Sequence, residues 1–227
     1  LSLDDLSKLL KTVPPILGMS IEDNLEPKLT WLQERLSLDD KSLRKLVRDG
    51  PVVLGLSIEE NLEPKLVWLQ DRLSLDDKSL SKLVQTMPPV LGYSIEDNLD
   101  PKLSWLQERL SLDDKSLSKL VRRWPAVLCL SIQENLEPKL VWLQDRLSLD
   151  DKSLSKLVGK LPTVLGISIE ENLEPKLVWL QERLSLDDKS LSKLVGKLPA
   201  VLGCSIEDNL EPKLSWLQDR LSLDDKR

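Results

Sequence analysis

The sequence predicts an all-α superhelical solenoid, and three features support this prediction. A tryptophan recurs every 37 residues, at Trp31, Trp68, Trp105, Trp142, Trp179 and Trp216. Two series of prolines, starting at Pro14 and at Pro27, keep the same step. The chain is 41% hydrophobic and 31% charged, with little glycine, which suits stacked amphipathic helices. A period of this length is typical of proteins in which each repeat buries its apolar face against its neighbours.

The period also sets the expected domain organisation. Because the core and the surface are both distributed along one axis, we expect a single domain over residues 1–227. The predicted repeats are 1–36, 37–73, 74–110, 111–147, 148–184 and 185–221, and residues 222–227 begin a truncated repeat.

Residues 37–73 illustrate the first half of a repeat. Asp39 has the character of a helix N-cap, and a short helix is expected to follow it and to end before Pro51. Residues 51–54 are expected to form about one helical or 3₁₀ turn. Gly55 is suited to a left-handed exit from that turn.

The second half of the repeat predicts a second helix. Ser57 and Glu60 form a capping box at its start. Apolar residues then follow at steps of four, four, three and four, which places them on one stripe of the helix. They are Ile58, Leu62, Leu66, Leu69 and Leu73. Because Pro64 removes a backbone donor, we expect a kink there or a short helix abutting a longer one.

The composition argues against several classes of protein. The chain has no histidine, so the commonest general base and metal ligand is absent, and we expect no enzyme, no metal site and no cofactor. Its two cysteines, Cys129 and Cys204, fall at non-equivalent positions, so no disulfide framework is expected. No apolar run approaches the ~20 residues that span a membrane, and the chain opens on repeat residues, without a targeting segment.

The residues that recur in each repeat resemble the mitochondrial transcription termination factor (mTERF) repeat. In the third repeat they are Leu80, Leu83, Val84, Pro88, Val90, Leu91, Gly92, Ile95, Leu99, Pro101, Leu103 and Leu106. The turn after the second helix is Leu73 and Ser74, where that family usually has Leu-Gly. The resemblance covers essentially the whole chain. It implies a left-handed superhelix that binds nucleic acid in a concave groove, with duplex DNA favoured over RNA, and a role in transcription and organelle gene expression in a mitochondrion or chloroplast.

One flank of the second helix gathers basic residues beside the repeated tryptophan. Asn61, Lys65, Trp68 and Arg72 share this flank, and the acidic residues lie on the other side. In one interpretation the tryptophan packs between repeats while the lysine and arginine stems cover it. In the other, this flank faces the groove and contacts phosphates. The candidate residues of this series are Lys65, Arg72, Lys102, Arg109, Lys139 and Arg146.

A second set of candidates lies where the repeats differ, in the three residues before each proline of the first series. Six positive and one negative side chain give these positions a charge of +5, which leaves −11 for the rest of a chain whose net charge is −6. Selection of these side chains for binding a ligand would explain the excess of positive charge. Tolerated sequence drift, or cations that compensate the dipole at the helix C-termini, would explain it as well. The candidate nucleic-acid-binding residues here are Lys11, Arg48, Arg122, Arg123, Lys160 and Lys197.

Three hypotheses for function follow. The first is a nucleic-acid-binding protein that uses the two sets of basic residues. The second is a protein-interaction scaffold, because an acidic solenoid could bind basic or helical partners. The third is a designed or duplicated array without a natural ligand. The apolar stripe of the last repeat, with Leu214, Leu217 and Leu221, is expected to be exposed or to associate end to end with another molecule.

Overall fold

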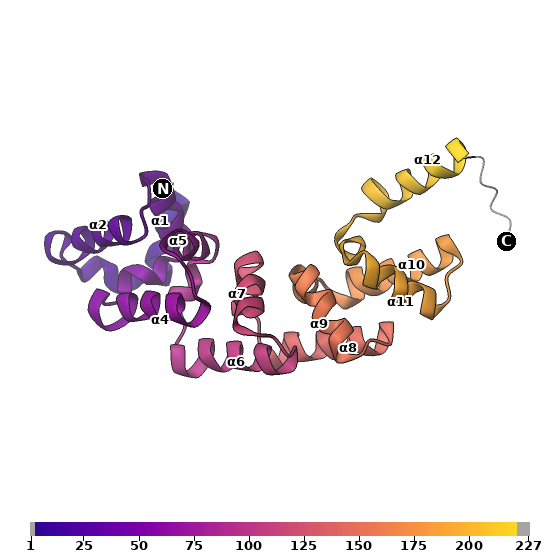
Figure 1. Ribbon diagram of the computed structural model, residues 1–227. Coiled ribbons are helices and arrows are strands. Elements are labelled where there is room, and N and C mark those ends of the chain that lie inside the picture. The colour runs from indigo at the N-terminus through magenta and orange to yellow at the C-terminus, as the bar shows by residue number, and fades with distance from the viewer. Residues whose placement is uncertain (1–2, 222–227) are drawn as a thin grey trace. The chain divides into compact units, whose positions relative to one another are not determined.

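The computed structural model describes residues 3–221, and within that range the chain is helical, with no strand (Figure 1). Pairs of helices recur at intervals of about 37 residues, which confirms the all-α solenoid. The handedness that the family resemblance implies stays a prediction.

Each repeat contains four helical segments in the same order. The first α-helices are α1 (Leu3–Thr12), α3 (Asp40–Asp49), α5 (Asp77–Thr86), α7 (Asp114–Arg123), α9 (Asp151–Lys160) and α11 (Asp188–Lys197). The 3₁₀ turns are η1 (Pro14–Gly18), η3 (Pro51–Gly55), η5 (Pro88–Gly92), η7 (Pro125–Cys129), η9 (Pro162–Gly166) and η11 (Pro199–Gly203). The π-helical turns are η2 (Ile21–Leu25), η4 (Ile58–Leu62), η6 (Ile95–Leu99), η8 (Ile132–Leu136), η10 (Ile169–Leu173) and η12 (Ile206–Leu210). The second α-helices are α2 (Glu26–Arg35), α4 (Glu63–Leu73), α6 (Asp100–Arg109), α8 (Glu137–Leu147), α10 (Glu174–Leu184) and α12 (Glu211–Leu221).

Local side chains fix where these segments begin. The carboxylate of Asp39 accepts a hydrogen bond from the backbone N–H of Ser42 at 2.7 Å, which confirms the predicted N-cap of α3. The hydroxyl of Ser57 accepts a hydrogen bond from the backbone N–H of Glu60 at 3.2 Å and caps η4. These caps satisfy N–H groups that a helix start would otherwise leave unpaired.

The proline inside the second helical segment produces the predicted break. The N–H groups of Leu62 and Glu63 donate to carbonyls five residues back, those of Ser57 and Ile58, so the chain makes a π turn before the α-helical pattern begins. Pro64 then stands in the first turn of α4, where a missing N–H costs little. A short helix thus abuts a longer one.

Within the described chain the residue with left-handed backbone conformation is a serine at the end of each second helix through α10, and the expectation for Gly55 is wrong. No glycine in the described chain has a positive φ, whereas Ser74 has φ 48° and its equivalents have nearly the same value. Ser74 donates to the carbonyl of Asp71 and Leu75 to that of Gln70, the paired hydrogen bonds of a Schellman motif. The left-handed turn therefore joins the second helix to the next repeat, where the family usually has glycine.

The chain divides into two compact units, residues 1–130 and 131–227. In the first unit α5 packs on α3 and α4, and α7 packs on α4 and α6. In the second unit α9 packs on α8, and α11 packs on α8 and α10. A first helix therefore contacts the second helices of two preceding repeats, and the hydroxyl of Ser81 accordingly donates to the carbonyl of Leu36 at 2.5 Å. The single domain over residues 1–227 stays a prediction.

The core of each unit consists mainly of leucine and valine, and all four kinds of helical segment contribute to it in the internal repeats. Four of the five residues in the predicted stripe are buried, with Leu62, Leu66 and Leu69 at 0% and Leu73 at 1% exposure, whereas Ile58 at its start is half-buried. The equivalent stripe of the last repeat is not covered within the described chain, because Leu217 is 41% and Leu221 59% exposed, while Leu214 is half-buried. This confirms the exposure expected at the end of the array.

Candidate nucleic-acid interface

The lysines of the second helices are buried between repeats. Lys102 is only 5% exposed, and its ammonium group donates to the carbonyl of Leu128 in the next repeat at 2.5 Å and to the side chain of Asn98 at 3.1 Å. Lys65 donates to the carbonyl of Leu91 at 2.7 Å, and Lys139 to that of Ile167. Burial lowers the pKa of Lys65, Lys102 and Lys139 below the ordinary value of a lysine. These ammonium groups hold successive repeats together.

The arginines of the second helices are also committed to the next repeat. Arg72 contacts the carboxylate of Asp100 at 3.4 Å and donates to the side-chain oxygen of Gln107 at 2.7 Å. Arg146 repeats the pattern with Glu174 at 2.8 Å and Gln181 at 2.7 Å. Arg109, at the equivalent position, also has an interaction partner.

These contacts favour the packing interpretation for the whole second-helix series. Lys65, Lys102 and Lys139 are buried, and Arg72, Arg109 and Arg146 are half-buried. A phosphate would have to displace a hydrogen bond between repeats to reach any of the three lysines. The tryptophan beside them is half-buried in the first five repeats, which agrees with a position between repeats.

The variable candidates lie at the C-terminal ends of the first helices and are all exposed. They are Lys11 on α1, Arg48 on α3, Arg122 and Arg123 on α7, Lys160 on α9 and Lys197 on α11. Arg48 is paired with its neighbour Asp49 at 2.8 Å, so part of its charge is compensated locally. A helix C-terminus favours cations, which contributes to their placement.

A further series of lysines on the first helices escaped the sequence prediction. Lys45, Lys82, Lys119, Lys156 and Lys193 occupy one position of α3, α5, α7, α9 and α11 and are exposed. We call them the first-helix lysines. They lie three and four residues before the variable positions, so both sets share one helix face. The sequence feature that could have revealed these residues is a lysine at the same position on the polar face of every first helix.

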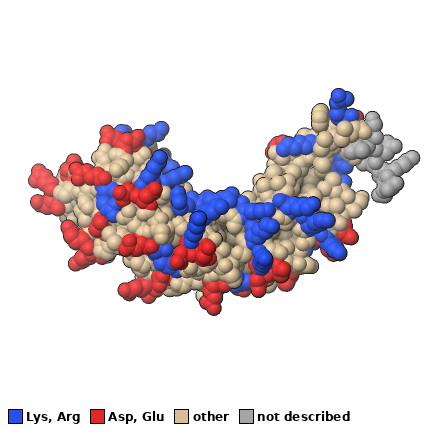
Figure 2. All heavy atoms as spheres, viewed as in Figure 1, with Lys and Arg blue, Asp and Glu red and all other residues tan. Residues whose placement is uncertain are grey.

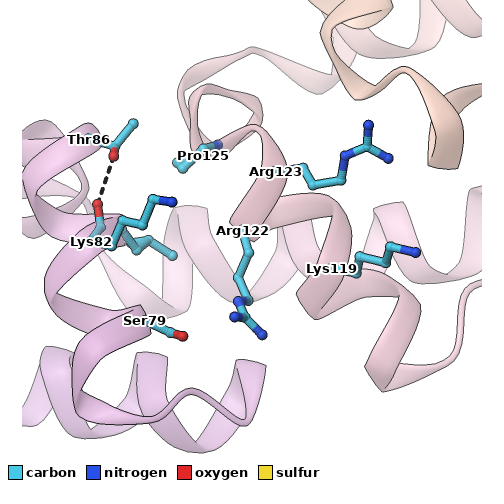
Figure 3. A pocket seen from close by; sticks show the side chains of 8 residues that line it. Ser79, Lys82, Thr86, Lys119, Arg122, Arg123 and Pro125 are labelled. Carbon is cyan, nitrogen blue, oxygen red and sulfur yellow. Dashed lines mark hydrogen bonds between the residues drawn. The ribbon is translucent and has the colours of Figure 1, made fainter.

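In the first unit, the two sets line a basic pocket of about 360 Å³ between α5 and α7 (Figure 3). Its lining residues are Ser79, Lys82, Leu83, Thr86, Lys119, Arg122, Arg123 and Pro125. Arg122 extends from α7 toward the side of α5 that carries Ser79 and Lys82. Four cations and two hydroxyl groups line this pocket and no carboxylate does, so its electrostatics favour an anion.

A neighbouring hollow of about 610 Å³ continues the same face between α3 and α5 of the first unit. Lys45, Lys78 and Lys82 line it, together with one carboxylate, that of Asp77. Lys82 belongs to both hollows, so the basic surface extends along the exposed faces of consecutive first helices.

The space-filling view agrees with this separation of charge. Lys and Arg atoms gather over α7 in the first unit, and over α9 and α11 in the second unit (Figure 2). Asp and Glu atoms gather along the lower edge of each unit in the same view. The net charge of −6 therefore hides a local basic face.

The geometry so far defines an α-helical repeat protein with a basic face built from its first helices. The sequence model of the mTERF family matches residues 1–225, and the chain belongs to this family. Membership indicates a nucleic-acid-binding repeat protein, and such factors are not enzymes. The family is typically organellar. No curated protein matches the chain.

Residues 3–221 contain neither a membrane-spanning helix nor a cluster of carboxylate and cysteine metal ligands. No helix there combines the length and the apolar character needed to cross a membrane. No group of three or more cysteine, aspartate or glutamate side chains in the described chain is arranged to hold a metal ion. Cys129 and Cys204 are free thiols.

Proposed function

We propose that this protein binds duplex DNA through the exposed face of its first helices. The observation that carries the proposal is the basic pocket, which is lined by Lys82, Lys119, Arg122 and Arg123 and by no carboxylate. Lysine and arginine contacts to phosphate supply most of the sequence-independent affinity of DNA-binding proteins. Family membership supports a role in gene expression in a mitochondrion or chloroplast.

The division of labour between the two helices explains how an acidic protein can bind an anion. Charges further apart than about 8 Å are largely screened at physiological salt, so contact is decided by local charge. The second-helix cations are used inside the array, and their carboxylate partners, such as Glu63 and Glu174, are partly neutralised there. The cations of the first helices, by contrast, lie on the exposed surface, where a phosphate could reach them.

The composition of the pocket favours a duplex over single strands. Proteins that bind single strands without sequence preference stack the bases on aromatic side chains. The pocket instead combines lysine and arginine with Ser79 and Thr86, and hydroxyl side chains are common partners of phosphate oxygens in protein–DNA complexes. Such a surface fits a regular phosphate backbone.

The test is a salt-dependent binding titration on the 227-residue chain. Duplex DNA, duplex RNA and single strands of one sequence are titrated with the protein and with the variant K82A/K119A/R122A/R123A. For duplex DNA, the slope of log K against log salt should become less steep by roughly three to four units, at about 0.9 per phosphate contact. Because the four side chains are exposed, the helical content should not change.

A charge-conserving variant, K82R/K119R/R122K/R123K, is the matched control and should keep the slope of the unmodified protein. A quadruple alanine variant that also keeps the slope would contradict the proposed interface. Tighter binding of RNA or of single strands would replace duplex DNA as the ligand. No affinity for any nucleic acid at low salt would favour the protein-interaction scaffold.

A further inference from the structure

Two of the four sulfur-containing side chains of the protein meet at one place in the first unit. The sequence holds two cysteines and two methionines. Met87 stands just before the 3₁₀ turn η5, Cys129 is the last residue of η7, and these two turns pack against each other. The thiol of Cys129 donates to the thioether sulfur of Met87 at 3.3 Å. This pair is peculiar to one junction, because glycine occupies the position of Cys129 in every other repeat.

The two sulfur atoms differ in their access to solvent. Met87 is only 7% exposed, so its thioether is buried and directed at Cys129. Cys129 is exposed, which leaves the pair open to an ion that arrives from solvent. Thiolate and thioether groups are soft ligands that suit Cu(I), whereas Mg²⁺ and Ca²⁺ prefer oxygen. The pair therefore has the donor atoms and the access that a site for a soft monovalent metal ion requires.

Two further side chains favour a thiolate at Cys129. The phenol of Tyr93, just after η5, forms a hydrogen bond with Cys129, and this contact is the largest cause that raises the pKa of Tyr93 to about 12. The phenol thus stays protonated and acts as a donor to the sulfur. The ammonium group of Lys102 lies 5.7 Å from the centre of the Tyr93 ring and donates to the carbonyl of Leu128, the neighbour of Cys129. A nearby ammonium group favours the thiolate, which is the form of cysteine that binds metal.

We propose that Cys129 and Met87 bind one Cu(I) ion. The ion replaces the thiol proton, which is released to solvent, and a copper–sulfur bond forms to the thiolate. The thioether of Met87 supplies the second ligand, and no electron is transferred. Since one monovalent cation replaces another, the charge of the site does not change.

The geometry needs only a small adjustment to hold the ion. With metal–sulfur bonds of about 2.3 Å, the two sulfur atoms have to separate by at most about 1.3 Å from their contact in the empty site. Met87 has three rotatable side-chain bonds and Cys129 is exposed, so both side chains can move this far. The sequence expectation of no metal site rested on the absence of histidine, which a site with two sulfur ligands does not need.

The test is an anaerobic titration of the 227-residue chain with Cu(I), in competition with a coloured Cu(I) chelator and without nucleic acid. One ion should bind tightly per chain. C129G should abolish this binding, and circular dichroism should show unchanged helical content, because glycine is the residue of the other repeats. M87L keeps a side chain of similar volume and should weaken binding by at least about tenfold. X-ray absorption at the copper edge should show one sulfur neighbour fewer in M87L than in the unmodified protein.

Cys204 provides the matched control within the same chain. Its thiol donates to the carbonyl of Ala200 at 3.4 Å rather than to a thioether. C204S should therefore keep the affinity and the stoichiometry of the unmodified protein. An unchanged affinity in C129G or in M87L would overturn the proposal, and so would a loss in C204S as large as that in C129G. DNA binding does not enter this experiment, so its outcome is separate from that of the proposed function.

Discussion

Two consecutive helices of the array use the same kind of side chain for different purposes. Lys102, on the second helix α6, is 5% exposed and donates to a carbonyl of the next repeat. Lys119, on the following first helix α7, is exposed and lines the basic pocket. The difference lies in what each helix faces, because the second helix meets the next repeat whereas this face of the first helix meets solvent. A repeated lysine is therefore no evidence for a ligand until its neighbours in the array are known.

The largest expected difference between these two regions is in stability. Replacing Lys102 by Ala leaves the buried carbonyl of Leu128 without its donor, which should cost about 2–3 kcal/mol. Replacing Lys119 by Ala should change stability by less than about 0.5 kcal/mol, because that side chain is exposed. Urea unfolding followed by helical circular dichroism measures both, with midpoints compared because repeat arrays need not unfold in two states. Equal midpoint shifts for the two variants would remove the distinction.

A substitution in the turn between these two helices should raise the stability of the protein by a smaller amount. Ser111 holds φ 47°, a conformation that costs an L-residue ~1–2 kcal/mol, whereas glycine adopts it without steric cost. After the extra entropy that glycine loses on folding, Ser111→Gly should stabilise the protein by about 0.5–1 kcal/mol. Thermal unfolding measures this change. Ser111→Ala is the control and should bring no gain, and a gain from alanine would show that the left-handed turn is not the cause.

The smallest effect concerns the caps of the first helices. Hydrogen bonding by the side chain and the backbone of Ser116 holds the pKa of Asp113 below its ordinary value of 3.8. A lowered pKa in the folded state means that this stabilisation is present above pH 3.8 and is lost as the pH falls through the folded value. Asparagine caps a helix equally well without titrating. The variant D76N/D113N should therefore lose less thermal stability than the unmodified protein on acidification below that pH, and identical pH profiles would contradict this account.

Local sequence was enough to predict most of the repeat. The caps at Asp39 and Ser57, the 3₁₀ turn after Pro51 and the break at Pro64 all depend on residues within one helical turn of each other. The left-handed residue was misplaced because glycine permits that conformation but does not require it. The Schellman hydrogen bonds at the end of α4 impose it on Ser74 instead.

The basic face was harder to predict because it depends on contacts between repeats. Lys65 reaches a carbonyl 26 residues further along the chain, a contact that helical periodicity within one repeat does not reveal. Variation drew attention to Arg122 and Arg123, which do line the basic pocket. It drew attention away from Lys82 and Lys119, since these are the same in neighbouring repeats.

The most direct test of the two roles compares equal losses of charge on the two helices. The variant K82A/K119A removes two exposed first-helix lysines, and K65M/K102M removes two buried second-helix lysines while keeping side chains of similar length. Binding of duplex DNA is titrated against salt for both. The account predicts that K82A/K119A reduces the steepness of log K in log salt by about 1.8 units and that K65M/K102M leaves it unchanged. A reduced slope for K65M/K102M together with an unchanged slope for K82A/K119A would contradict it.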